Sequence, residues 1–144
     1  MSDNLGEAPT GPTSPLLEKM GIAFAEVAAR RTVATMPVEG NTQPVGLLHG
    51  GASCVLAETA GSVAANTHAN TMGMVAVGLE ISATHHRGVR SGVVTATAEA
   101  VHLGRSTATY EIAITDEQHR RVCTARLTCV FLPDPSQGEA PPKG

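Results

Sequence analysis

Three stretches in the second half of the chain alternate between two kinds of side chain, and this alternation constrains the fold more than any other feature. In residues 92–102, 107–115 and 121–132, apolar or small residues take every second position, and threonines and charged residues take most of the others. A period of two is typical of antiparallel strands with one covered face. Residues 116–119, between the last two stretches, are interpreted as a hairpin turn.

The middle of the chain shows a different period. Residues 51–66 carry small and apolar side chains at helical spacing on nearly every face, which is typical of a helix buried on most sides. A further strand is expected over residues 74–83, and one or two short strands between residues 22 and 38. These elements predict an α+β architecture in which a large antiparallel sheet wraps one long helix.

A short helix is expected near the start of the chain. Ser14 is a typical helix cap, the proline after it suits the first helical position, and Gly21 is a typical stop, so residues 16–20 should be helical.

The chain length of 144 residues fits a single domain. We place this domain at residues 15–132, because the segments on either side have little to bury. Residues 1–14 and 133–144 are rich in Gly, Pro, Ser and Thr and are expected to be flexible tails.

Aromatic side chains are scarce, which narrows the possible functions. The chain has Phe24, Tyr110 and Phe131 and no Trp, whereas a stacking surface for single-stranded nucleic acid needs several rings. The formal net charge is −3, and no run of Lys or Arg exceeds two residues. A surface that binds polyanions requires clustered positive charge, so we expect no nucleic-acid partner.

The cysteines and the N-terminal segment indicate where the protein is located and whether it binds a metal. Cys54, Cys123 and Cys129 have no zinc-ligand spacing. The last two lie in one expected strand, about 20 Å apart, which is too far for a disulfide. No secretion signal is visible, and no apolar run approaches the ~20 residues of a membrane span. We therefore expect a cytoplasmic protein without a metal or a membrane partner.

Glu58 is the most conspicuous candidate for chemistry. It lies in the middle of the apolar helix, with Cys54, Val55, Gly61 and Ser62 at helical spacing around it. A carboxylate in such surroundings must be paired, protonated or functional. The alternative, equally weighted from periodicity alone, is that Glu58 occupies the one solvent-facing strip of the helix.

The start of the same helix is a second candidate site. His49, Gly50 and Gly51 place free N–H groups and the positive end of the helix dipole where a ligand oxygen could approach, although two adjacent glycines also suit a simple turn. Glu58 follows Gly50 by eight residues, or about 12 Å of helix rise. If both groups act on one small reacting centre, two chains must build that centre.

Other sequence patterns are weaker indications of a functional site. The segment around Ser53 resembles a nucleophile elbow, but Val55 replaces the second glycine of that motif. His85 and His86 are adjacent in an extended segment, so they point to opposite faces and chelate a metal poorly. Three arginines near strand ends could hold a phosphate or could simply be solvated: Arg87, Arg90 and Arg105.

Three segments resemble a known family. QPVGLLHGGASCVLAETAGSVA, VAVGLEISATHHRGVRSG and AVHLGRS are similar to the hotdog-fold acyl-CoA thioesterases, over residues 34–132. The branch holds the phenylacetate-pathway, 4-hydroxybenzoyl-CoA, enterobactin-proofreading and dihydroxynaphthoyl-CoA (menaquinone) enzymes, and the resemblance is strongest to the last two. It implies the hotdog fold, a long central helix wrapped by a curved antiparallel β-sheet.

The resemblance also implies roles for individual residues. Glu58 matches the catalytic carboxylate, and Gly50 matches the residue whose N–H polarises the thioester carbonyl. Gln43 and His49 match side chains that flank this carbonyl, and Ser62 matches a hydroxyl that helps to place water. The family's site takes Gln43, His49 and Gly50 from one chain and Glu58 and Ser62 from the other.

Contacts to the coenzyme A part of the substrate are implied at two regions, with Arg90 added from its position near a strand end. The expected contact residues are His85, Arg87, Arg90, Gly104, Arg105 and Ser106. His86 and the order of Arg105 and Ser106 depart from the family pattern. The resemblance further implies a homodimer that assembles into a homotetramer, and no metal or redox cofactor.

The expected function is hydrolysis of an acyl-CoA, with an aromatic acyl group, to the free acid and CoA. Glu58 would act as general base or as nucleophile, and Gly50 N–H would stabilise the developing oxyanion. Two alternatives remain open: a hotdog hydratase or dehydratase, and an acyl-CoA-binding module without catalysis.

Overall fold

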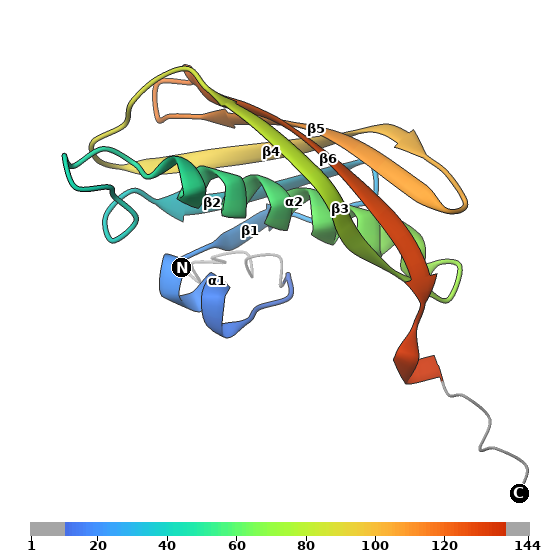
Figure 1. Cartoon of the computed structure of the whole chain (residues 1–144). Helices are drawn as coiled ribbons and strands as arrows, with labels where there is room; N and C mark the ends of the chain where they lie inside the picture. Colours follow the sequence, from blue (N-terminus) through green and yellow to red (C-terminus); the bar gives the residue numbers. More distant parts are fainter. Residues whose placement is uncertain (1–10, 138–144) are drawn as a thin grey trace, which may run out of the picture.

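One long helix lies against the inner face of a curved antiparallel sheet in the computed structural model, which describes residues 11–137 (Figure 1). The sheet has six strands in the order β1-β2-β4-β5-β6-β3. The elements are α1 Pro15–Met20, β1 Ala23–Glu26, β2 Arg31–Pro37, α2 Gly50–Asn70, β3 Met74–His85, β4 Val93–Leu103, β5 Thr107–Thr115, β6 Arg121–Pro133 and the 3-10 turn η1 Pro135–Gln137. The α+β prediction is therefore confirmed.

Alternation along the strands decides which face of the sheet meets the helix. In β5, Tyr110, Ile112 and Ile114 are fully buried, as the period of two predicts. In β6 the same side holds Cys123, Leu127 and other buried residues. Because one-residue slips would turn these side chains outward, the pattern also specifies the register of the strands.

The short helix α1 forms as its capping residues predict. The Ser14 side chain accepts a hydrogen bond from Leu17 N–H at 3.4 Å, and Gly21 ends the helix with a left-handed φ of 73°. The hairpin turn between β5 and β6 also forms, with Asp116 N–H donating to the carbonyl of Arg120 at 3.0 Å.

Small residues let α2 approach the sheet closely. Ala57, Ala60, Gly61 and Ala64 are buried on its inner face. A methyl group built on Gly61 would lie 2.6 Å from Leu127 Cδ2 of β6, so the helix backbone and the sheet are separated by little more than one side chain.

The helix is less buried than its sequence predicts. A stripe on its outer side is only half-buried in the single chain: Cys54, Val55, Glu58, Thr59, Ser62, Val63, Asn66 and Thr67. The helix also continues to Asn70, beyond the expected end at residue 66. Tertiary contacts hold this extension, since His68 Nε2 lies 2.9 Å from the carbonyl of Gly104 and its ring packs on Phe131.

Strand β3 forms one edge of the sheet and exposes apolar side chains. Val77 and Leu79 have exposed fractions of 41% and 65%. A bulge at Leu79 separates the pairs Gly78–Cys129 and Glu80–Thr128 between β3 and β6. An exposed apolar edge strand is a ready partner for another strand.

The ends of the chain differ partly from the expected tails. Residues 1–10 and 138–144 lie outside the described residues, and residues 11–14 have no helix or strand. At the other end, β6 includes Pro133 and is followed by a 3-10 turn, so regular structure extends past residue 132. No helix within residues 11–137 has the length and apolar character needed to cross a membrane.

Tyr110 gives a direct test of this packing. Its side chain is fully buried and its hydroxyl donates to the carbonyl of Ala29, and burial raises the pKa of Tyr110 from 10.0 to about 12. The chain has one Tyr and no Trp, so phenolate absorbance reports this group alone. We expect an absorbance midpoint near pH 12 for the folded protein and near pH 10 in denaturant.

The same shift sets the direction of a stability change. Between the two pKa values the folded protein holds a proton that the unfolded chain has lost, so the free energy of unfolding falls as the pH rises. The contribution of Tyr110, about 2–3 kcal/mol, is present below pH 10 and is lost as the pH approaches 12. Tyr110→Phe should remove this part of the pH dependence. A native phenolate midpoint near pH 10 would contradict the buried placement.

Candidate active site

A pocket opens at the N-terminal end of α2, beside the C-terminal end of β3. Gln43, Gly50, His85 and Arg87 line it, together with Leu47, Leu48, Ser53, His86, Gly88 and Val122. The structure therefore brings four of the residues singled out from the sequence to one place. Glu58 and Ser62 do not line this pocket.

Gly50 is the first residue of the helix, and its lack of a side chain matters here. A methyl group at this position would lie 3.0 Å from His85 Nε2 and 3.2 Å from Cε1, so the His85 ring packs directly against the start of the helix. In the described residues, no acceptor is bonded to Gly50 N–H. This donor, at the positive end of the helix dipole, is available to a carbonyl oxygen in the pocket.

His49 has a structural task that the sequence did not indicate. It caps α2, and its Nδ1 accepts a hydrogen bond from Gly51 N–H at 2.8 Å. Because Nδ1 is an acceptor, the neutral ring carries its proton on Nε2. His49 is exposed and is not part of the pocket lining.

The side-chain amide oxygen of Gln43 accepts hydrogen bonds from backbone groups of its own loop. Gln43 Oε1 accepts from Val45 N–H at 2.7 Å and from Leu47 N–H at 3.4 Å. Its backbone N–H also donates to the carbonyl of Leu47 at 2.8 Å. These bonds hold the amide oxygen, and Gln43 is one of the residues that line the pocket.

Glu58 and Ser62 lie together, one helical turn apart, on the half-buried stripe of α2. A methyl group built on Gly78 of β3 would lie 2.5 Å from Glu58 Oε1, so the carboxylate rests on the backbone of the edge strand. The sequence left two interpretations of Glu58, a functional carboxylate on an apolar helix and a residue of the solvent-facing strip. The structure shows Glu58 on the less buried strip of the helix and, at the same time, in contact with the sheet. The helix rise still separates it from Gly50 by about 12 Å.

Cys129 lies beneath this carboxylate. It is fully buried and is the partner of Gly78 across β3 and β6. Burial raises the pKa of Cys129 to about 11; a hydrogen bond with the Ser62 side chain lowers it, and the nearby Glu58 charge raises it. The thiol is thus held neutral next to the Ser62 hydroxyl.

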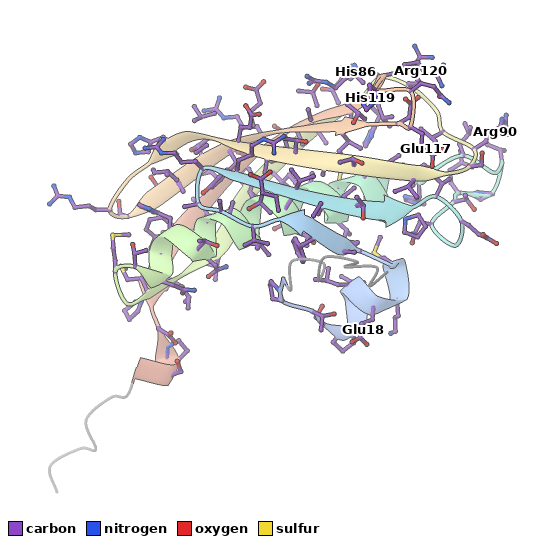
Figure 2. All side chains as sticks on the ribbon, turned by 180° about the vertical axis from the view of Figure 1, so that it is seen from behind. Glu18, His86, Arg90, Glu117, His119 and Arg120 are labelled. Carbon is purple, nitrogen blue, oxygen red and sulfur yellow. The ribbon has the colours of Figure 1, made fainter. Side chains whose placement is uncertain are left out.

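The residues expected to contact coenzyme A are not gathered at one place in the chain. His85 and Arg87 reach the pocket, and Arg90 lies further along the same loop between β3 and β4, with Nη1 3.4 Å from the carbonyl of Val45. Figure 2 shows Arg90 at the same end of the molecule as Glu117 and Arg120. The turn of residues 104–106 is at the other end of α2, where Gly104 meets His68. Within one chain the two regions therefore lie at opposite ends of α2.

Two residues of the site escaped the sequence analysis, Gly78 and Asn66. Asn66 accepts from Ala76 N–H at 2.9 Å and donates to Ala76 carbonyl at 3.2 Å, so it occupies the free edge of β3 at that residue. A signal for Gly78 was present, because an isolated glycine inside a strand indicates a bulge or a close approach. Within residues 11–137, no group of three or more His, Cys, Asp or Glu side chains is placed to hold a metal ion.

Comparison with known proteins agrees with this fold. The model of the Thioesterase superfamily matches residues 45–123. The proofreading thioesterase EntH of Cronobacter sakazakii is 48% identical over 118 residues, which are 81% of this chain and 85% of that protein. The chain belongs to the Thioesterase superfamily.

Solved structures of thioesterases share this fold. Thioesterase HI1161 of Haemophilus influenzae has a TM-score of 0.77 and 39% identity over 84% of this chain and 85% of that one. A mutant of thioesterase PA1618 of Pseudomonas aeruginosa has a TM-score of 0.79 and 43% identity over 83% and 86%. The expected hotdog fold is confirmed, and the protein is a thioester hydrolase.

The capping role of His49 can be tested by stability. His49→Ala removes the acceptor of Gly51 N–H and should lower the free energy of unfolding by about 1 kcal/mol. His49→Asn should restore most of it, because Asn is among the best capping residues. Denaturant unfolding measures both variants. Equal stability of His49→Ala and the unmodified protein would contradict the role.

Proposed function

We propose that this thioester hydrolase cleaves an acyl-CoA, with an aromatic acyl group, at a site that two copies of the chain share. The observation that carries the proposal is the placement of the two reactive ends on one helix. Gly50 N–H opens into a pocket, whereas Glu58 rests on the edge strand about 12 Å along the helix. Neither end alone holds both an oxyanion donor and a carboxylate.

The edge of β3 supports a specific pairing of two copies. Asn66 already occupies the backbone groups of Ala76, so the free part of this edge starts beyond that residue and runs to the strand end at His85. An antiparallel self-pairing of this free segment would bring the Gly78 end of one copy toward the His85 end of the other. The Glu58 carboxylate lies on Gly78, and the His85 ring packs against Gly50. This pairing would therefore bring the Glu58 carboxylate of one copy close to the Gly50 N–H of the other.

The chemistry follows from these groups. Gly50 N–H and the Gln43 amide would polarise the thioester carbonyl and stabilise the oxyanion that forms. Glu58 of the other copy would take a proton from water as it attacks, or attack the carbonyl itself and form an anhydride that water then opens. In both routes a C–O bond forms, the C–S bond breaks and CoA leaves as the thiol. Ser62 would orient the water near the carboxylate.

The coenzyme A portion would use the cationic groups beside the pocket. Arg87 and Arg90 can bind phosphate oxygens through their guanidinium donors. Residues Gly104, Arg105 and Ser106 lie at the far end of α2 and could contribute only to a site completed by another copy. The aromatic acyl group and the assembly of dimers into a tetramer follow from the resemblance to the 4-hydroxybenzoyl-CoA and dihydroxynaphthoyl-CoA enzymes.

Glu58→Gln tests the carboxylate. The substitution keeps size and hydrogen bonding but removes basicity and nucleophilicity, so we expect kcat to fall by roughly 10²–10⁴-fold with the fold intact. Thiol release should be followed with a panel of aromatic, short aliphatic and long aliphatic acyl-CoAs and an acylated carrier protein. A folded Gln variant that keeps more than about a tenth of kcat would remove Glu58 from the reaction. A change in alkene absorbance without thiol release would indicate a hydratase instead.

Mixed dimers test the shared site. Gln43→Ala and Glu58→Ala chains, each nearly inactive alone, are unfolded and refolded together in equal amounts. In a mixed dimer one site receives both changes and the other receives neither, so about a quarter of all sites should be intact. Activity should recover toward roughly a quarter of the unmodified level. Absence of recovery, with mixed dimers confirmed by mass, would show that each site takes both residues from one chain.

A further inference from the structure

We propose that Gly78 positions the catalytic carboxylate of Glu58 by having no side chain. This inference rests on the proposed role of Glu58. The contact behind it is within one chain: a methyl group at Gly78 would lie 2.5 Å from Glu58 Oε1 and 3.5 Å from Cδ. The carboxylate therefore fills the space that any other residue at position 78 would occupy.

The backbone at Gly78 does not require glycine. Gly21, Gly40, Gly46, Gly73 and Gly92 have positive φ angles, and Gly78 does not. Its φ therefore lies outside the left-handed region that favours glycine, and glycine in a strand interior lowers stability relative to alanine. Glycine is therefore needed at this position because Glu58 occupies the space above the strand that a side chain would fill.

The surroundings leave the carboxylate little freedom on the side of the sheet. Leu127 Cδ1 of β6 lies 3.8 Å from the same point above Gly78. Cys129 is the cross-strand partner of Gly78, and the Ser62 hydroxyl contacts its thiol. A methyl group at residue 78 would push the carboxylate outward, away from this floor, by about 1 Å. A misplacement of that size can lower a rate by about 10²-fold.

The bulge at Leu79 fits the same role. It places one extra residue in β3 directly after Gly78, and its side chain is 65% exposed. Bulges redirect the residues around them and are common beside active sites. Here the bulge follows Gly78 directly, and the exposed Leu79 beside it is not part of the core.

Gly78→Ala separates positioning from folding. The atom in the way is the end of a flexible side chain, so the protein should fold with an unchanged or higher midpoint of thermal unfolding. We expect kcat to fall about 10–100-fold, KM to stay within about threefold, and the dimer to persist in size-exclusion chromatography. Full activity of a folded, dimeric Gly78→Ala protein would overturn the proposal.

A double-mutant cycle gives the specific readout. Glu58→Asp shortens the side chain, so in the Gly78→Ala background it relieves the collision that the new methyl causes. The loss of kcat caused by Glu58→Asp should therefore be at least about fivefold smaller in that background than in the unmodified protein. Effects that multiply independently would overturn the proposal even if each single variant is impaired.

Gly61→Ala is the matched control. Its methyl group would meet a neighbour at 2.6 Å, nearly the same distance, but that neighbour is Leu127 in the core. We expect a lower thermal midpoint and little change of kcat per folded molecule, the opposite of Gly78→Ala. Glu58→Gln separates the two levels of the argument. If it remains active, the proposed function fails; if it is inactive while Gly78→Ala is fully active, only the positioning role fails.

Discussion

The close packing of α2 on the sheet is the constraint on which the rest of the structure depends. Ala57, Ala60 and Gly61 allow the helix to lie almost on β5 and β6, and Leu127 fills the space that a larger residue at 61 would need. With one helix face packed in this way, the opposite stripe stays half-buried in the part of the chain that the structure describes. Glu58 belongs to that stripe and lies on the strand beside it.

The proposed chemistry is divided along the same helix. A helix start supplies N–H donors and a positive dipole end, and these are at Gly50, next to His85 and the Gln43 loop. A carboxylate at that end would compete for those donors, whereas eight residues away it is held against Gly78. Keeping the oxyanion donor and the carboxylate apart within a chain allows their meeting to depend on assembly.

Much of the fold could be predicted, because each element repeats its own period. The strands of residues 107–115 and the turn after them follow the prediction closely, since inward side chains must reach one core. The helix end could not be predicted: His68 extends the helix through contacts to Gly104 and Phe131, which are remote in sequence. For the site, position on the helix made Gly50 and Glu58 candidates, but it could not show that His49 caps the helix or that residues 104–106 lie at its far end.

The sequence by itself determined the class of fold, because this depends on local period, and its resemblance to known thioesterases indicated the family, whereas the reactive residues that it indicates remain a prediction. Only the tertiary structure decided which backbone the carboxylate rests on and which part of the β3 edge stays free. The first depends on the contact of Gly78 with Glu58, 20 residues apart in the sequence, and the second on the hydrogen bonds of Asn66 with Ala76, 10 residues apart. Such contacts arise only when the helix is laid on the sheet, so no local pattern records them.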